Sequence, residues 1–303
     1  MCNPIFKFDF QKDFREYCEH FLLSYGVELP DSPMETKVMY WKIYQRLIHG
    51  KQPRKIYKSL YIQSNIDKDL SKGLSILEGK VEKGENINSH LSSLSLTPPK
   101  SNFNDGMLND WGIHHFHLGT SYDKNGLIER TSQLLYAIVT QDGFYEICLA
   151  EHGRWTDKQL LQIVYDNWGN LLKRFSIPDI QISKDVPSEM LKKLRSACIN
   201  TPVTLDDGTV LLCPGGGIST NGTSSIAIEL LDRFDLFLQA QTESFNSTAK
   251  QQSLIDYCKE NNPSLVTITE ISVNMVFDDN DIFNPKINIS GLSLTEEPVI
   301  HRE

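Results

Sequence analysis

The clearest structural signal in this chain of 303 residues is a β-hairpin. Two runs that are rich in apolar, β-branched and aromatic residues, 134–140 and 144–150, flank the sequence Gln141-Asp142-Gly143. Asp-Gly is a favoured pair for a tight turn between antiparallel strands. Histidines occur on both sides of this hairpin region, so we expect a catalytic or ligand-binding site near it.

The stretch GIHHFHLG, residues 112–119, contains three of the eight histidines of the chain. Its alternation of apolar and polar residues predicts a strand or a strand end. On extended backbone His115 and His117 share one face, and His114 lies on the other with Phe116. A His-x-His pair on one face is typical of a metal-ligand pair or an acid–base pair. The alternative is that these are hydrogen-bonded structural histidines beside a turn.

The remaining pattern predicts an α+β fold, with helices and strands in separate parts of the chain. A helix over 9–25 has Asp9 as its N-cap and stops at Gly26. We also expect strands over the long alternating runs near the C-terminus. The other predicted helices cover 34–49, 53–61, 156–175, 185–200 and 248–261.

These elements suggest four parts. Residues 1–78 form a helical N-terminal module, and the Ser-, Asn- and Pro-rich residues 79–106 form a linker. Residues 107–200 form a central α+β domain with a hairpin, a sheet and a flanking helix. Residues 201–303 form an acidic and mostly β region, in which the periodicity of 224–242 does not separate strand from helix. The glycine-rich residues 214–222 are expected to be a flexible loop, with a backbone anion nest as the alternative.

Charge and composition limit the partners. The net charge is −9, and residues 201–303 carry five Lys and Arg against fifteen Asp and Glu. Such a surface repels phosphates, so we do not expect binding to duplex DNA, whereas the acidic region suits a protein partner. No run is apolar enough to span a membrane, and the start lacks a secretory signal. Six scattered cysteines without a CxxC pair predict reduced thiols, no structural zinc and a cytoplasmic protein.

The central region resembles the RelE/YoeB-like toxin endoribonuclease family over residues 110–155. The matching features are His117-Leu118-Gly119, then Arg130, then LLYAIV at 134–139, and Glu151-His152-Gly153 at the end of the hairpin. This chain departs from the family because it is about three times longer and acidic. Its histidine is followed by Gly153 and Arg154, where the family often has a terminal aromatic residue.

The resemblance implies metal-independent cleavage of RNA by an endoribonuclease, in a toxin–antitoxin or phage-defence setting. A general base deprotonates the 2′-hydroxyl, a general acid protonates the leaving 5′-oxygen, and a cation stabilises the charged phosphate. The implied acid is His152, the phosphate-stabilising residue is Arg130, and His115 or His117 completes the catalytic set. We expect RNA-binding contacts from His114, Arg154 and Trp155, and neither a metal nor another cofactor.

Two hypotheses from other classes remain. The protein is a non-catalytic interaction component that binds through its acidic C-terminal region, with structural histidines. Alternatively, it is a metal-dependent hydrolase in which His115 and His117 bind the metal with His152 or Glu151 as a third ligand. A chelator separates the metal-dependent enzyme from the RelE-like nuclease.

Overall fold

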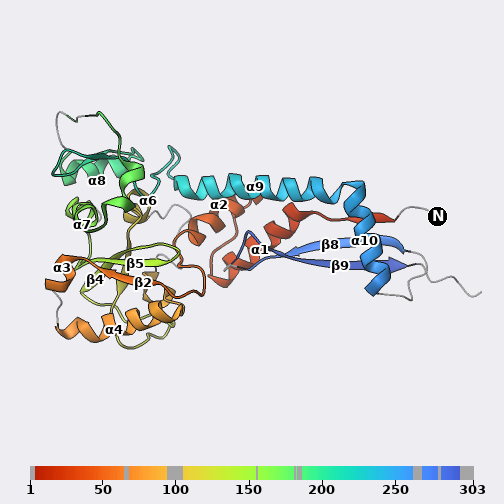
Figure 1. Ribbon diagram of the computed structural model, residues 1–303, viewed down its shortest axis with the longest axis horizontal. Coiled ribbons are helices and arrows are strands. Elements are labelled where there is room, and N and C mark those ends of the chain that lie inside the picture. The colour runs from red at the N-terminus through yellow and green to blue at the C-terminus, as the bar shows by residue number, and fades with distance from the viewer. Residues whose placement is uncertain are drawn as a thin grey trace, which may run out of the picture. The chain divides into compact units, whose positions relative to one another are not determined.

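The computed structural model of the chain describes residues 4–64, 68–93, 105–154, 156–180, 182, 186–261, 268–278 and 281–293. Their helices and strands confirm the α+β class (Figure 1). Among these residues, no helix is long and apolar enough to cross a membrane. The strands are β1 (Ile5–Lys7), β2 (Lys55–Lys58), β3 (His114–His117), β4 (Gln133–Val139), β5 (Gly143–Glu151), β6 (Val203–Thr204), β7 (Val210–Leu211), β8 (Ile268–Val276) and β9 (Lys286–Ser293). The helices are α1 (Phe10–Ser24), α2 (Pro33–Tyr44), α3 (Leu60–Ser64), α4 (Lys68–Lys83), α6 (Gly106–Trp111), α7 (Gln159–Trp168), α8 (Ser188–Ser196), α9 (Ser225–Phe245) and α10 (Thr248–Asn261), with short 3₁₀ helices η1 (Asn88–His90), η2 (Gly169–Leu171) and η3 (Lys173–Phe175).

The chain divides into two compact units. Unit 1 consists of residues 1–21, 30–37 and 231–303, and unit 2 of residues 22–29 and 38–230. The boundaries fall inside α1, α2 and α9, so they differ from the four consecutive parts expected from composition. The reason is non-local pairing, because β1 near the N-terminus lies parallel to β8 near the C-terminus.

Unit 2 is built on a four-stranded sheet with the order β2-β5-β4-β3. The predicted hairpin is β4 and β5, which pair antiparallel, and β3 adds to the outer edge of β4. β2 pairs parallel with β5 on the other side. Figure 1 shows α7 on one face of this sheet and α4 on the opposite face. Both faces are therefore covered, which explains why the central part of β4 is buried without interruption.

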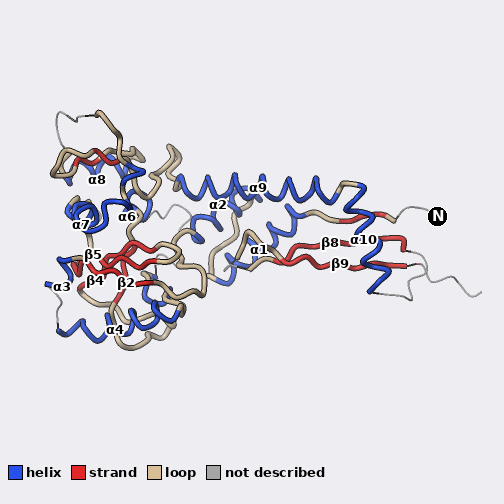
Figure 2. Tube along the Cα trace, in the orientation of Figure 1, coloured by secondary structure: helices blue, strands red, loops and turns tan. Residues whose placement is uncertain are grey.

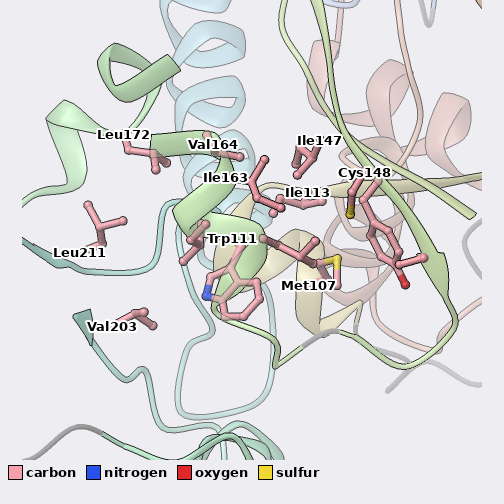
Figure 3. Close-up of a cluster of buried hydrophobic side chains, with 14 of the residues drawn as sticks. Met107, Trp111, Ile113, Ile147, Cys148, Ile163, Val164, Leu172, Val203 and Leu211 are labelled. Carbon is pink, nitrogen blue, oxygen red and sulfur yellow. The ribbon is translucent and has the colours of Figure 1, made fainter. Parts of the chain in front are cut away.

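The face of the sheet beneath α7 carries the main core of unit 2. Tyr136 of β4 and Cys148 of β5 meet Leu161 and Val164 of α7, and Trp111 of α6 joins them. These apolar side chains are almost fully withdrawn from solvent, and Figure 3 shows Trp111 and Val164 among the side chains of the cluster. Burial of such side chains stabilises a fold by roughly 1.5–3 kcal/mol each. The α7 core therefore fixes the sheet on which the histidines lie.

Unit 1 has an aromatic core. Asp9 caps α1 by accepting the amide N–H of Lys12 at 2.9 Å, and Gly26 follows the helix with a φ of +69°, as predicted. Phe14 of α1 packs on Phe234 of α9, with the ring centres 4.3 Å apart. Unit 1 also contains the three-stranded sheet β1-β8-β9, in which the long strands β8 and β9 pair antiparallel (Figure 2).

Two expectations for the first hundred residues are wrong. Residues 55–58 are strand β2 rather than part of a helix, because their backbone pairs with β5. The expected linker, residues 79–106, includes the end of α4 and the 3₁₀ helix η1. Its side chains Ile87, His90 and Leu91 are buried, so its polar composition conceals a packed segment. Residues 94–104 of that linker lie outside the described residues.

The C-terminal region contains more helix than the expected mostly β character. Residues 225–245 form α9, whose buried side chains Ala227, Leu231, Phe234 and Leu238 follow one another at three- and four-residue steps. That spacing places them on one face of a helix. β6, β7, β8 and β9 supply the strands of the region.

The glycine-rich segment is packed rather than loose. A Cβ atom at Gly215 would lie 2.1 Å from the carbonyl oxygen of Leu108, so only glycine fits there. The amide of Gly215 donates to the carbonyl of Asp110 at 2.9 Å, and that of Gly217 donates to Asn109 at 2.7 Å. The segment therefore packs against the C-terminal end of α6 and donates hydrogen bonds to its carbonyl groups.

Candidate functional site

The register of the sheet places His115 and His117 on one shared face, as the alternation predicts. His115 lies opposite Tyr136 of β4, and His117 lies opposite Leu134. Tyr136 and Leu134 belong to the core beneath α7, so the two histidines share that face of the sheet. His114 and Phe116 belong to the opposite face.

The hairpin brings a third imidazole to this pair. β5 ends at Glu151, and His152 follows at the point where β5 runs beside the start of β4. The ring centres of His152 and His117 are 5.4 Å apart, and those of His152 and His115 are 6.4 Å apart. Arg130 precedes β4 by three residues, and its charge acts on both His117 and His152. The four predicted catalytic residues therefore gather at one end of the hairpin.

His117 is held in place and almost hidden from solvent. Only 2% of its surface is exposed, and its Nδ1 accepts the backbone N–H of Thr131 at 3.3 Å. Burial, followed by the positive charges of His152 and Arg130, lowers the pKa of His117 to about 4. Its ring is therefore neutral at pH 7 and carries its proton on Nε2. A buried imidazole with one nitrogen already engaged is suited to positioning its neighbours rather than to contacting a large substrate.

His115, His152 and Arg130 are the accessible members of the cluster. His152 and Arg130 are exposed and His115 is half-buried. Within the described part of the chain, none of these three side chains has a hydrogen-bond or ion-pair partner. Burial, and then the charges of His115 and Arg130, lower the pKa of His152. These groups are free to meet a ligand that carries negative charge.

His90 lies beside the same site, although no sequence pattern predicts it as a site residue. It is fully buried, and its Nδ1–H donates to the carbonyl oxygen of His117 at 2.8 Å. Its Nε2 accepts from the ammonium group of Lys80, 3.2 Å away, and Lys80 also donates to the hydroxyl of Tyr122 at 2.9 Å. Burial lowers the pKa of His90 to about 4, so it is neutral at pH 7. His90 lies in the segment expected to be a linker, where a lone histidine carries no periodic signal.

Of the predicted substrate-binding residues, His114 and Arg154 lie on different segments of the chain. His114 lies on the other face of β3 from the cluster. Arg154 forms an ion pair with Asp157 at 3.1 Å, near the start of α7. Trp155 lies outside the described residues.

The described residues contain no group of three or more His, Cys, Asp and Glu side chains arranged to hold a metal ion. Glu151, considered as a metal ligand, lies next to His152 at the end of β5, and its carbonyl oxygen accepts the hydroxyl of Tyr136 at 2.8 Å.

No protein family, curated protein or solved structure matches this chain.

Proposed function

We propose that this protein is a metal-independent endoribonuclease that uses His115 and His152 as its acid–base pair and Arg130 to stabilise the phosphate. One observation carries the proposal: two accessible imidazoles without hydrogen-bond partners in the described chain lie 6.4 Å apart beside an arginine without an ion-pair partner there. The resemblance of residues 110–155 to RelE/YoeB-like toxins suggests the same chemistry.

The spacing of the two rings suits one phosphodiester group. An acid and a base must each come within about 2.6–3.2 Å of the atom with which they exchange a proton. Two such hydrogen bonds, one to each of two oxygens on the same phosphorus, span a separation similar to that between His115 and His152. The guanidinium of Arg130 can then bind the non-bridging oxygens with two parallel N–H groups.

The roles follow from the chemistry. His115 accepts the proton of the 2′-hydroxyl as its oxygen bonds to phosphorus. The bond between phosphorus and the 5′-oxygen breaks, and His152 in its imidazolium form donates a proton to that oxygen. The lowered pKa of His152 favours the neutral ring in the free protein. The negative charge of a bound phosphate shifts the ring back toward imidazolium.

His117 and His90 position the pair rather than react. The 2% exposure of His117 separates it from the catalytic role expected from sequence, because the substrate cannot reach its ring directly. His90 supports His117 through its carbonyl oxygen. A toxin or phage-defence role, a cytoplasmic setting and a protein partner for the acidic C-terminal region remain predictions that accompany this proposal.

The test is cleavage of a mixed-sequence single-stranded RNA in the presence of EDTA. We expect wild type to cleave, and His152→Ala and His115→Ala to lose activity by about 10²–10⁴-fold, the usual contribution of general acid–base catalysis. His20→Ala is the matched control, because His20 is an exposed histidine on α1. Cleavage that disappears in EDTA favours the metal-dependent hydrolase. Absence of cleavage by pure wild type favours the non-catalytic interaction component.

A further inference from the structure

Unit 2 contains a second candidate site, whose lining includes none of His115, His117, Arg130 and His152. A cavity of about 460 Å³ opens where α6, the ends of β3 and β4, the 3₁₀ helices η2 and η3 and the glycine-rich segment meet. This volume lies within the range of about 300–1,000 Å³ typical of small-molecule sites. The residues that matter for its chemistry are Trp111, His114, Ile138, Arg174, Phe175 and Gly215.

The cavity has rigid walls. Gly215 presses against the last turn of α6, where a Cβ atom would collide with backbone. Gln45 also lines the cavity, and its Oε1 accepts the hydroxyl of Ser224 at 2.7 Å. Gly215 inside the glycine-rich segment and Ser224 just after it are therefore both held in place, which fixes this wall of the cavity.

The polar groups of the cavity are cationic or neutral. The guanidinium of Arg174 lies over the ring of Phe175, 4.6 Å from its centre, and Arg174 has no ion-pair partner among the described residues. His114 has no hydrogen-bond partner there either. None of the residues that line the cavity is Asp or Glu. The carboxylate of Asp105 acts on His114, but Asp105 caps α6 by accepting the amide of Leu108 and does not line the cavity.

We propose that this cavity binds a small organic anion with a flat apolar body, whose charged group contacts Arg174 and His114. Aromatic and aliphatic walls from Trp111, Phe175 and Ile138 accept a planar ring. Arg174 pairs with a carboxylate or a phosphate through parallel N–H groups. Because burial lowers the pKa of His114 to about 4, the neutral imidazole offers one N–H donor at pH 7. This site does not depend on the proposed nuclease activity.

The experiment is isothermal titration of the full chain with four probes. Indole-3-acetate and adenosine monophosphate carry a flat ring with a carboxylate or a phosphate. Tryptamine and adenosine supply closely related rings without the anion. We expect at least one anion to bind with a Kd below about 1 mM, and its neutral or cationic counterpart to bind at least tenfold more weakly. The anion that binds more tightly identifies a carboxylate or a phosphate as the preferred group.

Matched variants locate the binding. Arg174→Ala should weaken the bound anion at least tenfold, whereas Lys173→Ala, on the same 3₁₀ helix but outside the cavity, should not. Ile226→Trp should block the cavity, because Ile226 lines it and is 37% exposed, so a larger side chain need not disturb the core. Failure of both anions to bind overturns the proposal. The proposal is also overturned if Arg174→Ala or Ile226→Trp, with the melting temperature of wild type, binds the anion as tightly as wild type does.

Discussion

At the scale of single residues, a positive charge on one imidazole of the histidine cluster disfavours protonation of the neighbouring imidazoles. The pKa values of His117 and His152 are lowered by burial and then by positive charge nearby, because both disfavour protonation. Arg130 contributes to the lowered pKa of His152, and under the proposed function it would also bind the phosphate.

Arg130→Gln should raise the pKa of His152, because the substitution removes one of the two positive charges that lower it. The imidazole chemical shift of His152, followed by NMR across a pH titration, measures the change. Lys124→Gln is the control, since Lys124 lies in the same exposed loop and does not act on His152. An unchanged His152 titration in Arg130→Gln would show that the guanidinium does not reach this ring.

Glu146 is a buried acid whose pKa is raised, in contrast to the lowered pKa of His152. It is fully buried in β5, and burial together with the charge of Glu78 raises its pKa to about 8. A carboxyl group with a raised pKa contributes stability below its unfolded pKa, and this contribution is lost as the pH rises from about 4.5 to about 8.

We therefore expect Glu146→Gln to remove most of the fall in stability over that pH range. The difference between variant and wild type should grow to a few kcal/mol at pH 8. Urea unfolding at several pH values measures it, with the exposed Glu82→Gln on α4 as the control. A variant whose stability falls with pH as steeply as that of wild type contradicts the role assigned to Glu146.

At the scale of elements, α4 holds the end of β3 that carries His117. Gly73 of α4 lies so close to the chain that a Cβ atom would be 1.7 Å from the carbonyl oxygen of Leu118. Gly79, on the same helix, has open space around it. The close approach of Leu118 therefore requires glycine at position 73, whereas packing does not require glycine at position 79.

Gly73→Ala should destabilise the protein by at least about 1–3 kcal/mol, the usual cost of overpacking. Gly79→Ala should stabilise it by roughly 0.5–1 kcal/mol, since alanine loses less entropy in a helix. Thermal and urea unfolding compare the pair. Equal effects of the two substitutions would show that α4 does not pack tightly against Leu118.

Much of the local structure could be predicted from sequence, because it depends on short-range patterns. The β4–β5 hairpin, β3 and α1 follow from turn chemistry, alternation and capping. β2 could not be predicted, because its parallel pairing with β5 depends on residues about ninety positions away. α9 was undecided because its periodicity is clear only once its buried face is known.

In the candidate site, too, short-range patterns could be predicted from the sequence, whereas contacts with distant residues could not. Alternation along β3 puts His115 and His117 on one face, and the hairpin brings His152 to them. The burial of His117 could not be predicted, because it depends on Thr131 and on His90 from a polar segment. The cavity beside His114 could not be predicted from the sequence either, because its walls come from segments spread across unit 2.

At the scale of the whole molecule, unit 1 joins the two ends of the chain. β1 pairs with β8, and Phe14 packs on Phe234 and Phe277. The described residues of both the histidine cluster and the cavity belong to unit 2.

Phe14→Ala and Phe234→Ala should each destabilise unit 1 by about 3–5 kcal/mol. Because the two rings are in contact, the double variant should lose less than the sum of the single losses. Urea unfolding with a double-mutant cycle measures this, with the exposed Leu236→Ala on α9 as the control. Additive losses would contradict the contact.

The central claim is that the histidine cluster directs the 2′-oxygen of RNA onto the neighbouring phosphate. The most direct test is mass spectrometry of the ends produced when pure protein in EDTA acts on an RNA and on the same RNA with 2′-deoxy sugars. We predict 2′,3′-cyclic phosphate and 5′-hydroxyl ends from the RNA, no cleavage of the deoxy strand, and cleavage of the RNA by His152→Ala that is about 10²–10⁴-fold slower. Cleavage that leaves 5′-phosphate ends, or that proceeds on the deoxy strand, would contradict the claim.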